Sequence, residues 1–166
     1  MLRRLRGKGR DGAYQPPPPI SIQPIGRVAN RFATPRTRDW TSVRSRIVLR
    51  PDLAPALDGL AGHSHLLVIF WMHEVPEHAR TRVTHHLHGD EDLPRKGDLA
   101  TRSQNRPNPI GVSACRIEGF ADNVIRVVGL DAIDGTPVLD IKPYLGEYDA
   151  FDDAQAPPWV YGQFDG

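Results

Sequence analysis

A continuous apolar run at Leu66–Met72 constrains the fold of this chain more than any other feature of the sequence. The run has seven residues, far fewer than the roughly 20 that a membrane-spanning helix needs. It is rich in the β-branched and aromatic residues that favour strands. An unbroken apolar run of this length is typical of a strand covered on both faces. We therefore expect a buried strand that emerges at His73.

A second segment, Thr41–Arg50, alternates instead. Arg44 and Arg46 fall on one parity, and Val43 and Ile47 fall on the other. Because side chains of a strand point to opposite faces in turn, this spacing predicts a strand with one basic face and one buried face. Further strands are predicted at Ser21–Ala29, Ile110–Phe120, Asn123–Ile133 and Val138–Tyr144.

Helical patterns are scarce in this sequence. Only Asp52–Leu60 has the leucine spacing of a short helix, and Val75–Lys96 is polar enough to predict a mobile loop, either alone or with a short helix in it. No strand–helix alternation is present and no Gly-x-Gly-x-x-Gly follows a predicted strand, which argues against a Rossmann-type cofactor domain. The pattern predicts an all-β barrel or sandwich of six to seven strands, with one short helix and long loops.

The 166 residues are enough for one domain with a substantial core. We expect a basic, proline-rich tail at 1–19, a folded domain at 20–148 and a C-terminal tail at 149–166. The N-terminal tail is either a solvated extension or an arm attracted to RNA phosphates. Net charge is only +1, so binding to a polyanion must depend on a local patch.

The residues that carry redox and metal chemistry are few. Cys115 is the only cysteine, which excludes an internal disulfide and suits a reducing compartment. The N-terminus lacks the apolar stretch of a secretory signal, so we expect a cytoplasmic protein without a membrane partner. His63 and His65 could form a ligand pair, but no glutamate follows at the spacing of small β-barrel metalloproteins. We expect no metal.

The stretch Gly97–Gly111 carries two arginines, two hydroxyls and a Pro-Asn-Pro unit. Prolines after Arg106 and Asn108 favour an extended, stiff loop, which suits a ligand wall. A barrel could gather this loop and other strand-end turns at one mouth, where they would bind a polar small molecule of mixed charge. No nucleophile elbow or phosphate loop is present, so cofactor-borne group transfer is favoured over hydrolysis.

Four motifs follow one another along the chain: Ala100-Thr101-Arg102-Ser103, Arg106-Pro-Asn-Pro-Ile-Gly111, Asp134-Gly135-Thr136-Pro137 and Asp140-Ile-Lys-Pro-Tyr144. In this order they resemble the TsaA-like (TrmO-type) family, whose characterised members are S-adenosylmethionine-dependent tRNA methyltransferases. The resemblance covers about residues 20–148. It implies a β-barrel, a homodimer with S-adenosyl-L-methionine near the dimer interface, and methylation of the N6-threonylcarbamoyl-modified adenosine next to the tRNA anticodon.

The resemblance also implies roles for single residues. It assigns cofactor contacts to Pro35, Arg36, Thr37, Met72, His73, Arg102, Val112, Leu130, Asp131, Asp134, Gly135, Thr136 and Pro137. Arg102 suits the cofactor carboxylate, and Asp131 or Asp134 suits its ribose or amine. Asp140 or Tyr144 could take the proton of the amine. Arg106, Asn108 and Lys142 are candidates for the RNA or dimer surface.

The sequence departs from the family pattern at several positions. Thr37 replaces the glutamine of the usual Pro-Arg-Gln, and Asp98-Leu99 replaces the usual Val-Phe before Ala-Thr-Arg. These changes are compatible with a cofactor site, but they affect which tRNA the protein would be expected to act on. The alternative function is a noncatalytic module that binds S-adenosylmethionine or a related nucleoside.

Overall fold

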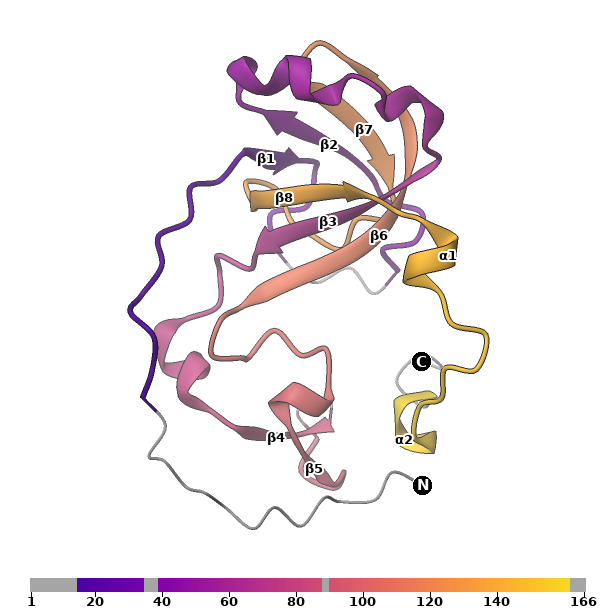
Figure 1. The fold of residues 1–166 in the computed structure, drawn as a ribbon. Helices are drawn as coiled ribbons and strands as arrows, with labels where there is room; N and C mark the ends of the chain where they lie inside the picture. The colour runs from indigo at the N-terminus through magenta and orange to yellow at the C-terminus, as the bar shows by residue number, and fades with distance from the viewer. Residues whose placement is uncertain (1–14, 35–38, 88–89, 162–166) are drawn as a thin grey trace.

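A computed structural model describes residues 15–34, 39–87 and 90–161 (Figure 1). Six antiparallel strands close into a barrel in the order β1–β2–β7–β6–β3–β8. The predicted all-β barrel is thus confirmed. The strands are β1 (Gly26–Ala29), β2 (Arg44–Leu49), β3 (His65–Trp71), β6 (Ile110–Ala121), β7 (Val124–Val128) and β8 (Pro137–Pro143).

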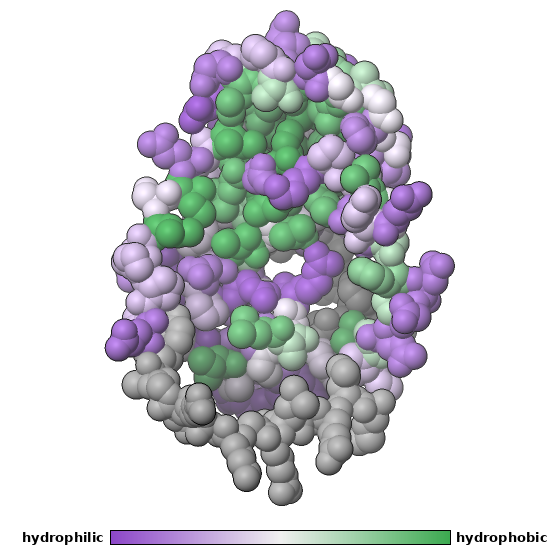
Figure 2. All heavy atoms as spheres, viewed as in Figure 1, coloured by the Kyte–Doolittle hydropathy of each residue, from purple (hydrophilic) through white to green (hydrophobic). Residues whose placement is uncertain are grey.

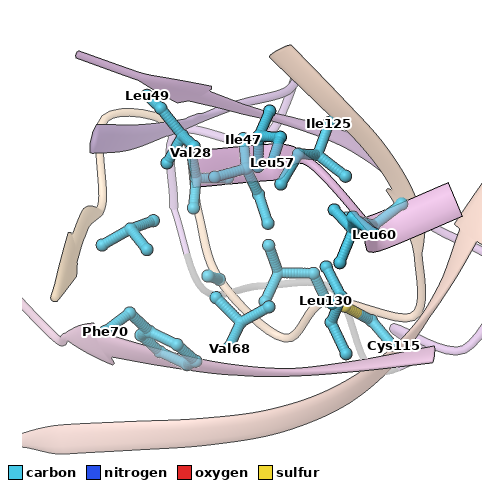
Figure 3. Close-up of a cluster of buried hydrophobic side chains, with 14 residues drawn as sticks. Val28, Ile47, Leu49, Leu57, Leu60, Val68, Phe70, Cys115, Ile125 and Leu130 are labelled. Carbon is cyan, nitrogen blue, oxygen red and sulfur yellow. The ribbon is translucent and has the colours of Figure 1, made fainter. Parts of the chain in front are cut away.

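The core of the barrel consists of every second residue of its strands (Figure 3). Ile47, Val68 and Ile125 are 0% exposed, while their chain neighbours turn outward. Burial of such aliphatic side chains stabilises the fold by roughly 1.5–3 kcal/mol each. The alternation predicted for β2 is confirmed, with Arg44 and Arg46 exposed and Ser45 and Ile47 buried.

Two predicted strands are shorter than expected. The first strand begins at Gly26 rather than Ser21, and Ile22 before it is 52% exposed. β7 ends at Val128, where Gly129 with φ +91° turns the chain out of the sheet. Glycine adopts a φ in this range at little cost. The turn at Gly129 therefore ends the strand that was predicted to continue to Ile133.

The helix predicted at Asp52–Leu60 is not an α-helix. Two 3-10 helices occupy this region, η1 (Pro51–Leu57) and η2 (Leu60–Gly62). Pro55 lies inside η1 and has no N–H to donate to an α-helical hydrogen bond, which favours the tighter turn. Leu57 and Leu60 are buried and close one end of the barrel core (Figure 3).

The region predicted as a long loop forms a small lobe beyond the other end of the barrel (Figure 1). It contains η3 (Glu77–Thr81), a pair of antiparallel strands, β4 (Thr84–His86) and β5 (Arg95–Gly97), and η5 (Asp98–Ala100). Two single-turn α-helices follow the barrel, α1 (Gly146–Asp149) and α2 (Pro158–Tyr161). Lys96 lies 5.1 Å from the ring centroid of Trp159, so the C-terminal segment packs on the lobe.

The two faces of β3 differ in burial. Leu66, Val68 and Phe70 lie in the core, whereas Leu67, Ile69 and Trp71 are only half-buried on the outer surface. We predicted that both faces of β3 would be buried. In this chain only the inner face is buried, and the outer face lies on the surface. Among the described residues, no helix is long and apolar enough to cross a membrane.

Candidate functional site

Two predicted segments meet at the barrel end that faces the lobe. Met72 and His73 follow β3, and the loop at 129–136 joins β7 to β8. The register of β3 and β8 pairs Phe70 with Val138, which brings the two segments together. His73 Nδ1 lies 3.4 Å from the hydroxyl of Thr136, a buried side chain.

The loop at 129–136 is held in place by β1. The side-chain amide of Asn30 donates to the carbonyl of Ala132 at 2.8 Å, and the backbone N–H of Asn30 donates to Asp134 Oδ1 at 3.0 Å. The N–H of Gly135 donates to the carbonyl of Val28 at 3.0 Å. Because these partners are far apart in sequence, Asn30 was missed by sequence reasoning. Its only local signal is a polar residue directly after a short strand.

Arg102 and Asp131 bring opposite charges to this end of the barrel. Arg102 Nη2 donates to the carbonyl of Val112 at 2.6 Å. The carboxylate of Asp131 reaches solvent, yet enough protein surrounds it that burial raises its pKa, while the charge of Arg102 acts to lower it. A guanidinium beside a carboxylate can bind the two charges of an amino-acid group.

An opening separates the barrel from the lobe, with hydrophilic residues along its lower edge and hydrophobic residues of the barrel above it (Figure 2). Arg106 shapes the loop that leads from the lobe to β6. Its guanidinium donates to the carbonyls of Thr101 and Ser103, at 3.2 and 3.0 Å. Asn108 is exposed on the same loop. The stretch Gly97–Gly111 is therefore ordered by its own hydrogen bonds.

The two candidate proton acceptors lie apart from this cluster. Asp140 forms an ion pair with Lys142 at 2.6 Å, on the outer surface of β8. Tyr144 follows β8, and its N–H donates to the carbonyl of His65 at 3.1 Å. His65 begins β3 and Met72 directly follows it, so the two lie about 23 Å apart at roughly 3.3 Å per residue. The structure does not bring Tyr144 to the other predicted site residues.

Three of the predicted cofactor residues, Pro35, Arg36 and Thr37, lie outside the described residues. Leu130, in the loop at 129–136, is fully buried, and Pro137 begins β8. In the described part of the chain, no group of three or more His, Cys, Asp or Glu residues could hold a metal ion.

The fold and this cluster define a small antiparallel β-barrel with a polar, mixed-charge site at one end. The sequence model of the tRNA-methyltransferase O N-terminal domain matches residues 26–150. The chain belongs to this family, as the resemblance of its motifs predicted.

Relatives and solved structures agree with this assignment. An S-adenosyl-L-methionine-binding protein of Archaeoglobus fulgidus is 33% identical over 132 residues, which cover 77% of this chain and 91% of the relative. The human tRNA (adenine(37)-N6)-methyltransferase is 33% identical over 144 residues, 79% of this chain but only 31% of the human protein. The crystal structure of TrmO from Pseudomonas aeruginosa superposes with a TM-score of 0.66 at 34% identity, over 82% of this chain and 61% of that one.

Proposed function

We propose that this protein transfers the methyl group of S-adenosyl-L-methionine to the N6-threonylcarbamoyl-modified adenosine next to the tRNA anticodon. The family match over residues 26–150 carries the proposal. It is supported by the human relative, which is named as a methyltransferase of adenine 37 in tRNA. The single buried cysteine, Cys115, suits a reducing cytoplasm, where the tRNA substrate is available.

The charges around Arg102 support a role in holding the methyl donor. The donor ends in an amino-acid group with a carboxylate and an ammonium. Arg102 binds the carboxylate, and Asp131 or Asp134 binds the ammonium or the ribose hydroxyls. Met72, His73 and the loop at 129–136 supply the wall that keeps the donor in one orientation.

The reaction itself requires positioning more than a covalent intermediate. When bound, S-adenosyl-L-methionine would supply a methyl group on a sulfonium, which the substrate nitrogen would take in exchange for S-adenosylhomocysteine and one proton. In-line alignment can supply a large part of the rate. Of the two candidate proton acceptors, Asp140 is the nearer to Met72 along β3 and β8, whereas Tyr144 lies beside His65 at the other end of β3.

We further propose a homodimer joined through the outer face of β3 and β6. Two cross-strand pairs present apolar side chains there, Ile69 with Val112 and Trp71 with Ile110. Ile110 and Val112 are 37% and 42% exposed, and Figure 2 shows hydrophobic residues gathered over the front of the barrel. Contiguous apolar surface of this kind marks an interface. The bond of Arg102 to Val112 sets the proposed cofactor site beside this face.

Other parts of the chain have proposed roles around this centre. Arg106 and Asn108 order the loop beside the dimer face, and Lys142 extends the polar surface of β8. We propose that residues 20–148 are the catalytic barrel domain, flanked by tails at 1–19 and 149–166. Residues 1–14 of the first tail lie outside the described residues.

A noncatalytic module that binds S-adenosylmethionine is the second candidate. The Archaeoglobus fulgidus relative favours it, because that protein is named only for binding S-adenosyl-L-methionine. The two functions differ in whether a methyl group is transferred.

The deciding experiment measures binding and transfer on the same preparation. Calorimetry with S-adenosylmethionine is followed by incubation with tRNA that carries the threonylcarbamoyl group and with tRNA that lacks it. Mass spectrometry of the digested nucleosides should find the methylated modified adenosine only in the first. Binding without transfer to either pool supports the module, and absence of binding contradicts both functions.

A further inference from the structure

The outer face of β1, β2 and β7 is dominated by arginine. Arg27 on β1, Arg44 and Arg46 on β2, and Arg126 on β7 are all exposed, while the residues between them face the core. β2 and β7 run side by side in the barrel wall. The face is therefore a two-dimensional array of guanidinium groups on a rigid sheet, and we call it the arginine face.

Arg46 stands directly opposite Arg126 in the pairing of β2 with β7. Like charges at opposed positions destabilise a sheet. Arg44 at the edge of the array is paired with Glu118 at 3.0 Å, but neither Arg46 nor Arg126 forms an ion pair with another described residue. Since the whole chain carries a net charge of only +1, this positive charge is a local concentration.

A shallow recess of about 510 Å³ lies on the arginine face. Ala29 is the one apolar residue among those that line it, together with Arg27, Asn30, Arg31, Arg44, Ser45, Arg46, Glu118, Arg126 and Asp134. Asn30 and Asp134 also fix the loop at 129–136. The recess thus runs from the arginine array to the proposed cofactor site.

We propose that the arginine face is the surface on which the phosphate backbone of the tRNA substrate docks. Arginine binds phosphate oxygens through parallel N–H bonds, and an array of such groups suits a polymer with evenly spaced charges. Ala29 is the only apolar residue of the recess, so the recess offers nothing to select the apolar side chains of a peptide or to hold acyl chains. The proposal rests on the proposed function, because it assigns the place where that substrate is held.

The test compares two double variants with the same change of charge. Arg46→Gln/Arg126→Gln removes two guanidinium groups from the arginine face. Arg82→Gln/Arg95→Gln removes two exposed guanidinium groups from the lobe. The affinity of each protein for tRNA is measured by fluorescence anisotropy between about 50 and 200 mM salt. S-adenosylmethionine binding is measured by calorimetry on the same samples.

We expect Arg46→Gln/Arg126→Gln to bind tRNA about tenfold or more weakly and to lower the slope of log affinity against log salt by about 1.5. S-adenosylmethionine binding should be unchanged. The melting temperature of this variant without RNA should be equal to or higher than that of the wild type, because the opposed charges are gone. If these arginines served only to stabilise the fold, the melting temperature of the variant would be lower than that of the wild type.

Two results would overturn the docking surface and leave the proposed function standing. They are an unchanged salt slope in Arg46→Gln/Arg126→Gln, or an equal loss of tRNA affinity in the lobe variant. A wild-type protein that binds S-adenosylmethionine but no tRNA overturns both proposals. A wild-type protein that does not bind S-adenosylmethionine contradicts the proposed function on its own.

Discussion

Arg102 is the single residue on which the cofactor proposal depends most. One N–H of its guanidinium donates to the carbonyl of Val112, and other N–H groups can donate to a ligand. We expect Arg102→Ala to weaken S-adenosylmethionine binding about 10- to 100-fold, since a hydrogen bond between charged groups contributes roughly 1.5–3 kcal/mol. Titration calorimetry measures the change, with Arg82→Ala as a control at an exposed arginine of the lobe. If both variants bind S-adenosylmethionine with the same affinity, Arg102 does not contact the cofactor.

Asp131 allows a prediction about pH. Burial raises its pKa above the ordinary value of 3.8, with Arg102 opposing the rise, so the native state holds this proton more tightly than the unfolded state. The contribution of this group to the free energy of unfolding therefore falls as pH rises from about 3.8 through the raised value. Asp131→Asn should unfold at higher denaturant concentration than the wild type above that window, and at the same concentration below it.

The same substitution should weaken S-adenosylmethionine binding at neutral pH, because the amide carries no negative charge for the ammonium or ribose. Denaturant titrations at several pH values, with calorimetry at neutral pH, check both parts. A variant that is less stable than the wild type at neutral pH would contradict the role of burial. If Asp131→Asn binds S-adenosylmethionine as tightly as the wild type, Asp134 rather than Asp131 is the carboxylate that contacts the ammonium or ribose.

At the scale of elements, β1 depends on close approach to β2. A Cβ atom at Gly26 would lie 2.4 Å from the carbonyl oxygen of Val48 and 2.8 Å from the Cα of Leu49. These are backbone atoms, so relief requires the two strands to separate. Gly26→Ala should lower the free energy of unfolding by about 1–3 kcal/mol, or the melting temperature by roughly 2–12 °C for a chain of this size.

Gly62 provides the matched control for this prediction. A Cβ atom at Gly62 meets nothing within 4 Å, and this residue ends η2 rather than pairing in the barrel. Gly62→Ala should change the melting temperature little. If calorimetric scans give both variants the melting temperature of the wild type, β1 is not held as closely against β2 as its register indicates.

For the whole molecule, the apolar outer face of β3 and β6 predicts association. We expect light scattering to give the mass of a dimer, and Ile69→Glu to give a monomer at the same concentration, because a charge would replace a half-buried contact at the interface. Val83→Glu, at a residue of the lobe that is 74% exposed, is the control. A monomeric wild type would contradict the dimer, and a dimeric Ile69→Glu would move the interface elsewhere.

The sequence by itself determined the six barrel strands and the identity of the family, but not β4 and β5, which lie where a loop was predicted. Period-two alternation is a local property, so β2 was predicted to within one residue at its end and three at its start. The apolar run at Leu66–Met72 correctly predicted β3, but not that one of its faces lies on the surface of the chain. The helix at Asp52–Leu60 was wrong in type, because Pro55 acts against the α-helical bonds that the leucine spacing favours.

Tertiary structure alone determined which side chains meet. Closure of the barrel brings Asn30 to Ala132 and Asp134, and brings Arg102 within electrostatic reach of Asp131. The register of β2 against β7 sets Arg46 opposite Arg126, although the alternation showed only that Arg46 lies on an exposed face. Such contacts depend on pairing between segments far apart along the chain, and a one-residue change of register would reverse them. Local patterns hold no information about that pairing.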